Sequence, residues 1–233
     1  KRLEQIWTSR SHFRTVVDDA SEALIRQMIH ERYPEHNIWS EEGGRSDMGS
    51  SLTWVWDAVD GTIPMFHGTS DHFSVCGALF DGAHPVLGVA NAVKRSEMYV
   101  AEIGKGAFCN RKPIRVSEEA ELGHVIIGID SGKSNRLAHM PYLEKAFGPN
   151  GVMVAFASGC ASVPLLLVAS GAYHAYLATS LEPEDMAAAV VIIREAGGKV
   201  TNLSGEEWKL GDVSILAANP VLHLKLGRFF NLF

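Results

Sequence analysis

Apolar residues recur at helical spacing near the start of the chain. The segment Asp19-Ala-Ser-Glu22 has the form of a helix capping box, and apolar residues follow it at helical intervals as far as Met28 and Ile29. We expect this helix to end near Tyr33, because the residue before a proline is disfavoured in the helical conformation and Pro34 comes next. The pattern therefore predicts an amphipathic helix that occupies most of this segment.

The next part of the chain has the pattern of strands joined by tight turns. A polar, glycine-rich loop at 43–51 leads into a β-prone run that delivers Asp57 at its end. Turns are expected at Asp81-Gly82 and Gly104-Lys-Gly106, between further runs of strand-forming residues. The expected strands are 52–56, 73–80, 85–93 and 97–102. This part predicts an antiparallel meander.

The pattern changes after an acidic, helix-prone stretch at 117–122. From there strands and helices alternate, and Gly197-Gly198 ends one of the helices. The expected strands are 124–129, 152–156, 173–177 and 213–217, and the expected helices are 161–169, 185–195 and a final one after 217. A meander followed by alternating elements predicts two lobes, residues 1–120 and 121–233.

Composition narrows the classes of function. The 233 residues are 46% hydrophobic and 21% charged and carry a formal net charge of -6, the profile of a globular chain with a large core. No broad cationic surface is available, so we expect no nucleic-acid partner. The most apolar stretches, such as 163–169, are too short to span a bilayer, so we expect no membrane association. Cys76, Cys109 and Cys160 form no CxxC pair, which favours a cytoplasmic protein with reduced thiols.

The most informative candidate chemistry follows the β-prone run at 52–56. Asp57 and Asp60 can converge on one point together with the carbonyl of Val59, and such all-oxygen donors suit Mg²⁺. Gly61 permits a tight turn, and free amides at a helix start near Thr62 can hold phosphate oxygens. An ordinary β-turn would also explain the motif, but charged groups directly after an apolar run need partners, which favours a site.

Three other acidic positions each have a structural and a functional interpretation. Glu41-Glu42 is either solvated surface or a metal ligand beside a group that orients water. Asp185 either caps the helix that it begins or faces Asp57. Asp18-Asp19 either caps a helix or polarises Thr62. Spacing alone leaves these alternatives open.

Five motifs in order resemble those of the inositol monophosphatase family of lithium-sensitive, magnesium-dependent phosphatases, and they run through nearly the whole chain. They are Tyr33-Pro34 with Trp39-Ser-Glu-Glu-Gly43, Trp56-Asp-Ala-Val-Asp-Gly-Thr62, Gly104-Lys-Gly-Ala-Phe-Cys-Asn110, Asp185-Met-Ala-Ala-Ala189 with Arg194-Glu-Ala-Gly-Gly198, and Ile215-Leu-Ala-Ala-Asn219.

The resemblance implies a five-layered αβαβα sandwich, with an antiparallel-meander lobe and a mixed-sheet lobe, that forms a homodimer. It implies two or three Mg²⁺ ions, with Li⁺ as an inhibitor. The implied metal ligands are Glu41, Asp57, the Val59 carbonyl, Asp60 and Asp185. The implied catalytic residues are Thr62, Asp18, Glu41 and Glu42. The implied phosphate- or substrate-binding residues are Asp60, Gly61, Thr62 and Asp185.

The chain also departs from the family pattern. Ala58 replaces a proline, Ile63-Pro-Met65 replaces a Thr-Asn-Phe continuation, and Glu184 replaces a tryptophan. The family's substrate-contacting arginine and glutamate fall at Phe156 and Ala178. The metal core is intact by residue type, so the resemblance implies a phosphomonoesterase that acts on a small sugar or polyol phosphate.

Other functions on the same fold stay open. Fructose 1,6-bisphosphate, histidinol phosphate and a 3′-phosphonucleotide are alternative substrates. A binding or regulatory module with weak turnover is the alternative from a different class of protein.

Overall fold

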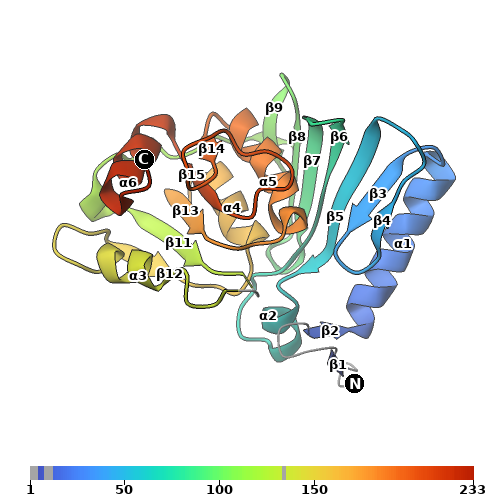
Figure 1. Cartoon of the computed structure of the whole chain (residues 1–233), viewed down its shortest axis with the longest axis horizontal. Helices are drawn as coiled ribbons and strands as arrows, with labels where there is room; N and C mark the ends of the chain where they lie inside the picture. Colours follow the sequence, from blue (N-terminus) through green and yellow to red (C-terminus); the bar gives the residue numbers. More distant parts are fainter. Residues whose placement is uncertain (1–4, 8–12, 133–134) are drawn as a thin grey trace.

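Two β-sheets separated by helices form the body of the protein. The computed structural model describes residues 5–7, 13–132 and 135–233. An eight-stranded and a five-stranded sheet are each covered by helices, and the two terminal strands β1 (Gln5–Trp7) and β2 (Phe13–Thr15) form a separate ribbon. From right to left in Figure 1 the layers are α1, the large sheet, α4 with α5, the small sheet, and α3 with α6. The expected five-layered αβαβα sandwich is confirmed.

The large sheet is the predicted meander with two further strands at one edge. Its strand order is β10-β9-β8-β7-β6-β5-β3-β4, and all neighbours are antiparallel except β3 and β5. The strands are β3 (Asn37–Ser40), β4 (Gly44–Ser46), β5 (Leu52–Asp60), β6 (Ser74–Asp81), β7 (His84–Ala92), β8 (Glu97–Glu102), β9 (Gly106–Cys109) and β10 (Lys112–Pro113). The segment 43–51, expected to be all loop, therefore contributes the short strand β4.

A β-bulge near the end of β5 sets the direction of two carboxylates. The prediction that the strand ends before Asp57 is wrong, because β5 continues to Asp60. Asp57 pairs with Cys76 and Asp60 pairs with Ser74, so β5 holds one more residue than its partner over this interval. Residues three apart in a regular strand point to opposite faces, and the extra residue returns both aspartates to the same face.

The small sheet is mixed. Its order is β12-β11-β13-β15-β14, with β11 parallel to both of its neighbours and the other pairs antiparallel. The strands are β11 (Ile126–Asp130), β12 (Val154–Phe156), β13 (Ala175–Ala178), β14 (Lys199–Thr201) and β15 (Ile215–Ala218). Because β11, β12 and β13 run in parallel, their carboxyl ends meet at one edge, where Asp130 lies.

The first long helix begins earlier than the sequence pattern indicated. Helix α1 spans Val16–Arg32, and Thr15 and Asp18 form its capping box. The capping box expected at Asp19 and Glu22 is therefore wrong, although the end before Pro34 is correct to within one residue. Thr15 precedes three residues that fit either strand or helix, which hid the cap from the periodicity.

The other helices match the pattern closely, with one addition and one loss. They are α2 (Thr62–His67), α3 (Met140–Ala146), α4 (Ser162–Ala169), α5 (Pro183–Glu195) and α6 (Pro220–Phe230). Helix α3 was not predicted. The acidic stretch 117–122 is not the expected helix, because the chain there has no regular secondary structure until a short 3-10 turn begins at Leu122.

The middle helices belong to the cores of both sheets. Helix α4 is buried along its whole length, and the core that contains Leu165 and Ile192 also holds Val55 and Ala90 of the large sheet. At Gly88 of β7 an added Cβ would lie 2.5 Å from the carbonyl oxygen of a residue in α5, so glycine allows close sheet–helix contact. The division into lobes at residue 120 stays a prediction. Among the described residues, none of the helices has the length and apolar character that a membrane crossing requires.

Candidate functional site

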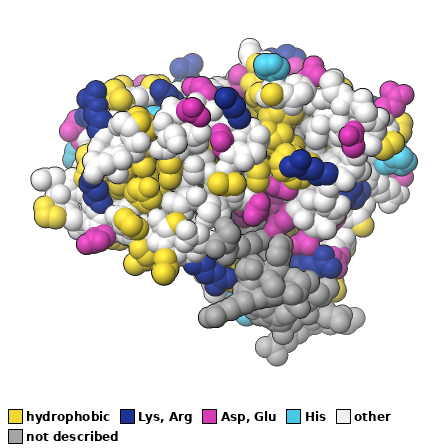
Figure 2. Space-filling model, in the orientation of Figure 1, with side chains coloured by type: hydrophobic (Ala, Val, Ile, Leu, Met, Phe, Trp, Pro, Cys, Tyr) yellow, Lys and Arg dark blue, Asp and Glu magenta, His cyan; other side chains and the backbone are white. Residues whose placement is uncertain are grey.

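A cavity of about 440 Å³ lies where the carboxyl edge of the small sheet meets the bulged end of β5. Its lining also includes the starts of α2, α4 and α5 and the side chain of Phe13. On the face drawn in Figure 2, Asp and Glu side chains gather in the hollow between the two halves of the molecule. Segments more than 100 residues apart in the sequence therefore share one acidic cavity.

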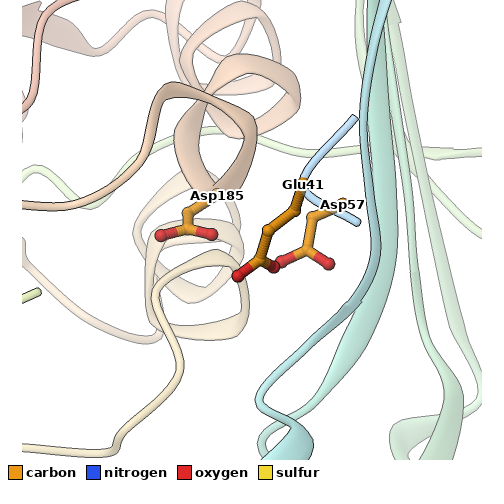
Figure 3. Close-up of side chains that lie close together, drawn as sticks. All are labelled: Glu41, Asp57 and Asp185. Atoms are coloured by element: carbon orange, nitrogen blue, oxygen red, sulfur yellow. The ribbon is translucent and has the colours of Figure 1, made fainter. Parts of the chain in front are cut away.

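Three carboxylates from three segments meet in this cavity. Glu41 follows β3, Asp57 lies in β5 beside the bulge, and Asp185 lies in the first turn of α5. One ligand atom from each lies within 4.8 Å of the others, and Figure 3 shows the three side chains pointing toward one another. Carboxylate oxygens at this spacing could hold one hard divalent cation.

The charges of this cluster are costly without a cation. Asp57 is 3% exposed, and burial together with the nearby charges of Glu41, Asp60 and Asp185 raises its pKa well above the ordinary value. Burial also raises the pKa of Asp60, although hydrogen bonds from Ser162 and Cys160 oppose the increase. A bound cation would offset the desolvation and the repulsion between like charges, so the residues present fit Mg²⁺ in donor type and in charge.

Asp60 lies on the same cavity wall but is held by the start of α4. Its Oδ2 atom accepts hydrogen bonds from the backbone N–H groups of Ala161 (2.9 Å) and Ser162, and Cys160 Sγ lies 3.1 Å away. The same carboxylate therefore accepts from the first amides of a buried helix, where a negative charge is favourable. Asp60 is not among the three carboxylates that converge within 4.8 Å.

The hydroxyl group of Thr62 joins β5 to α1. Thr62 Oγ1 lies 2.7 Å from Asp18 Oδ1 and 3.0 Å from the carbonyl oxygen of Val59. Asp18 Oδ2 accepts from the backbone N–H (2.8 Å) and the hydroxyl of Thr15, as a helix cap does. One oxygen of Asp18 thus caps the helix, and the other accepts a hydrogen bond from Thr62.

Gly61 forms the sharp turn between β5 and α2. Its φ is 89°, and an added Cβ would lie 2.5 Å from the carbonyl oxygen of His72. Glycine is therefore required both for the left-handed backbone and for the close approach. The turn brings Gly61 and Thr62 to the cavity wall beside Asp57 and Asp60.

Glu42 lies outside the converging carboxylates. Its carboxylate accepts from the guanidinium of Arg14 at 2.8 Å, and Asp19 lies 3.6 Å from the same guanidinium. Glu41 lines the cavity and Glu42 does not. The structure thus separates the two adjacent glutamates: the first faces the cluster and the second forms an ion pair.

Several cavity residues were missed by the sequence analysis. Asp130, Arg136, His139, Cys160 and Tyr176 all line the cavity. One signal was available for Asp130, which follows the apolar run 124–129 as Asp57 follows 52–56. Nothing local to the others distinguishes them, because the return of separate chain segments to one sheet edge brings them together.

Three of the departures from the family pattern lie around the cavity rather than in its wall, whereas a fourth, Ile63, lines it. Phe156 is 47% exposed and stacks on Tyr173 with ring centroids 5.8 Å apart. Ala178 is fully buried, and Glu184 is 6% exposed with a pKa raised by burial. None of these three side chains lines the cavity.

The fold is that of the αβαβα sugar-phosphatase class. Within that class, the chain belongs to the inositol monophosphatase family, whose model matches residues 5–229. The resemblance found in the sequence is therefore confirmed.

Relatives and solved structures agree with this assignment over nearly the whole chain. A putative Nus factor SuhB from Neisseria meningitidis serogroup B is 32% identical over 229 residues, which cover 94% of this chain and 85% of the relative. A fructose-1,6-bisphosphatase/inositol-1-monophosphatase from Thermotoga maritima is 30% identical over 217 residues, 93% of this chain and 82% of the relative.

Among solved structures, the extragenic suppressor protein SuhB from Bartonella henselae matches with a TM-score of 0.90 at 27% identity, covering 98% of this chain and 88% of that one. Inositol monophosphatase II from Staphylococcus aureus, solved with bound inositol monophosphate, matches with a TM-score of 0.81 at 30% identity, covering 91% of this chain and 83% of that one.

Proposed function

We propose that this protein is a Mg²⁺-dependent phosphomonoesterase that hydrolyses a small sugar or polyol phosphate. The observation that carries the proposal is the convergence of Glu41, Asp57 and Asp185 within 4.8 Å at a cavity that Thr62 also lines. In this proposal the metal ligands are those three carboxylates with Asp60 and the Val59 carbonyl. When bound, Mg²⁺ would neutralise charge on the phosphate oxygens and lower the pKa of water.

The residues of the chain would then activate and orient the reactants. The Thr62 hydroxyl donates a hydrogen bond to Asp18, so the Thr62 oxygen can accept a hydrogen bond from the attacking water. The backbone N–H groups of Gly61 and Thr62 would hold phosphate oxygens. We place Glu42 in a supporting role, since it is paired with Arg14 on the strand that leads into α1.

The cavity and the relatives support a sugar-sized leaving group. A volume of about 440 Å³ exceeds that of a phosphate group and leaves room for a sugar-sized partner. The relatives named for fructose-1,6-bisphosphatase and inositol-1-monophosphatase activities favour inositol phosphates and fructose 1,6-bisphosphate over histidinol phosphate or a 3′-phosphonucleotide. We also propose inhibition by Li⁺ and a homodimer, as the family resemblance implies, and a cytoplasmic location, which the three cysteines without a CxxC pair favour.

Release of inorganic phosphate from a panel of phosphate monoesters tests the proposal. We expect activity with Mg²⁺, none after complete chelation, and recovery when Mg²⁺ is restored. Asp60→Asn should lower kcat by about 10²-fold or more while the protein stays folded. Glu102→Gln is a matched control, since its carboxylate pairs with Lys105 on the surface. Full activity in the presence of a strong chelator would refute the proposal.

A second candidate is a binding or regulatory module that retains the fold. It is favoured by the name of the Neisseria relative, a putative Nus factor, and by the replaced residues at Ala58 and Ile63. Calorimetric titration with Mg²⁺ and phosphate separates the two candidates. An enzyme of the proposed type should bind them cooperatively, whereas a module without a working site should not.

A further inference from the structure

A loop that is hydrogen-bonded at each end connects two buried carboxylates that line the cavity. Asp130 ends β11, and Asp60 ends β5 in the other sheet. Between them runs the segment 158–162, which leads from β12 into α4; we call it the bridging loop. Both carboxylates line the cavity, and they are 7% and 8% exposed.

Asp130 holds the first half of the bridging loop. Its Oδ1 atom accepts from the backbone N–H groups of Ser158 at 3.1 Å and Gly159 at 3.4 Å. Its Oδ2 atom accepts from the hydroxyl of Tyr176 at 3.2 Å and lies 3.4 Å from Ser158 Oγ. Gly159 has a φ of 69°, so the loop turns sharply at the point where Asp130 holds it.

Asp60 receives the second half of the same loop. Three consecutive residues, Cys160, Ala161 and Ser162, direct a thiol and two backbone N–H groups at its Oδ2 atom. A displacement of the loop would therefore remove several donors from one oxygen at once. Because the carboxylate is buried, the loss would also leave it poorly solvated.

Other packing fixes the far end of this network. The ring of Tyr176 lies against Gly128, where an added Cβ would be 2.5 Å from Cδ2 of the tyrosine. Gly132, two residues after Asp130, is pressed against Ser180: an added Cβ would lie 1.3 Å from the serine carbonyl oxygen. Close packing at Gly128 and at Gly132, on either side of Asp130 in the sequence, thus restricts the position of its carboxylate. Asp130 can therefore act as a fixed anchor for the loop.

We propose that Asp130 is a positioning residue that orients Asp60 through the bridging loop, so that the two sheets present their carboxylates to the cavity in one fixed arrangement. The catalytic consequence rests on the proposed phosphatase function. The structural consequence, that Asp130 holds the loop in place, does not depend on the proposed function. The two can therefore be tested separately on the same variants.

Alkylation of Cys160 measures the loop without any reference to activity. Its thiol is 3% exposed and belongs to the loop, whereas Cys76 is 1% exposed and lies in β6. Rates for each cysteine are measured with iodoacetamide on the folded protein, followed by peptide mass spectrometry. Cys76 is the internal reference for global unfolding, because a loosened loop leaves it buried.

Two substitutions at Asp130 distinguish a positioning role from a requirement for its charge. Asp130→Ala removes every acceptor, and we expect the Cys160 rate to rise about 10-fold or more with the Cys76 rate unchanged. Asp130→Asn keeps an amide oxygen for the loop N–H groups and an NH₂ group that can face the Tyr176 hydroxyl, so the rate should stay within about twofold of wild type. Tyr176→Phe, which keeps the ring, should raise the rate about fivefold.

Phosphate release on the same variants tests the link to Asp60. Asp130→Ala should lower kcat and raise the Mg²⁺ concentration for half-maximal activity, and Asp130→Asn should restore most of both. An unchanged Cys160 rate in Asp130→Ala, or a parallel rise at Cys76, would overturn the proposal. So would an Asp130→Asn variant as impaired as Asp130→Ala. A selective Cys160 response in a protein with no phosphatase activity would support the loop anchor and refute only the proposed function.

Discussion

Thr62 Oγ1 lies 2.7 Å from Asp18 Oδ1, a hydrogen bond that spans 44 positions of sequence and joins the start of α2 to the first turn of α1. Asp18 is 3% exposed, and its second oxygen is occupied by the cap of its own helix. These contacts fix the orientation of the Asp18 carboxylate, and its hydrogen bond with Thr62 in turn fixes the orientation of the threonine hydroxyl.

Two replacements of Thr62 should distinguish the effect of its hydroxyl group on activity from the effect of its side-chain volume. Thr62→Val keeps the volume but removes the hydroxyl, so we expect kcat to fall about 10²–10⁴-fold with a small change in KM. Thr62→Ser keeps the hydroxyl and should retain most of the activity. Steady-state kinetics with Mg²⁺ check this, and equal activity in the two variants would rule out a role for the hydroxyl.

Asp57→Asn should make the metal-free protein more stable and remove the additional stability that Mg²⁺ gives to the wild type. Burial and the charges of Glu41, Asp60 and Asp185 raise the pKa of Asp57 above its ordinary value of 3.8, so the metal-free folded protein binds protons more tightly than the unfolded chain. Its contribution to stability is therefore full at pH below 3.8 and is lost as the pH rises through the raised folded-state pKa.

Thermal unfolding with and without Mg²⁺ checks this prediction. At neutral pH, Asp57→Asn should raise the Tm of the metal-free protein, since one of several repelling charges is gone. In the wild type, Mg²⁺ at about 100 times its Kd should raise the Tm by about 5–10 °C. That increase should be absent in the variant. A variant that still responds fully to Mg²⁺ would show that Asp57 is not a ligand.

His223 should make the protein sensitive to acid. It lies on α6, is 1% exposed, and its Nε2 atom is 3.0 Å from Thr201 Oγ1. Burial and, to a smaller extent, the nearby charge of Lys199 lower the pKa of His223 from 6.5 to about 4. Between these two values the unfolded chain binds the proton and the folded protein does not, so stability is lost as the pH falls, by up to about 1.4 kcal/mol per pH unit.

Urea unfolding at several pH values between 4.5 and 7.5 measures this effect. His223→Gln keeps a hydrogen-bonding group near Thr201 and does not titrate, so its free energy of unfolding should depend less on pH over this window. His124→Gln removes a histidine whose side chain is 69% exposed and serves as the control. Identical pH profiles for the wild type and His223→Gln would contradict the prediction.

Gly61→Ala should disturb the site more than a glycine replacement at an ordinary turn. Gly61 and Gly82 have φ values of 89° and 57°, but an added Cβ meets the His72 carbonyl oxygen at the first position and open space at the second. Gly82→Ala should cost about 1 kcal/mol of stability from backbone strain alone. Gly61→Ala should cost more, and it should also lower kcat because the strand-to-helix turn must shift. Chemical denaturation and kinetics on both variants check the difference.

The sequence predicted most of the elements because their periodicity is local. The strand at 97–102 and the helix at 161–169 were placed to within a residue, and the meander turns were correct. The capping box of α1 was misplaced, because Thr15 precedes residues whose apolar pattern fits both strand and helix. The stretch 117–122 has helix-forming residues, but its backbone instead reaches across to α6, where the Asn219 side chain donates to the carbonyls of Ser117 and Glu119.

For the candidate site, the sequence supplied residue types but not their arrangement. Capping a helix and lying at the site are not exclusive: Asp18 caps α1 and also accepts from the Thr62 hydroxyl, and Asp185 caps α5 and also joins the carboxylate cluster. The bulge that turns Asp57 and Asp60 to one face depends on pairing with β6 and is invisible in the sequence of β5. Asp130 and the bridging loop depend on contacts between the two sheets, which no local pattern encodes.

The buried middle layer has a mechanical consequence for the cavity. Because α4 and α5 pack against both sheets, spreading the two halves apart would carry Leu165, Ile192 and their neighbours into water. Each large apolar side chain exposed in this way costs about 1.5–3 kcal/mol. In the proposed phosphatase, substrate entry and product departure would therefore proceed by local movement at the cavity mouth, while the spacing of the carboxylates is fixed once, when the chain folds.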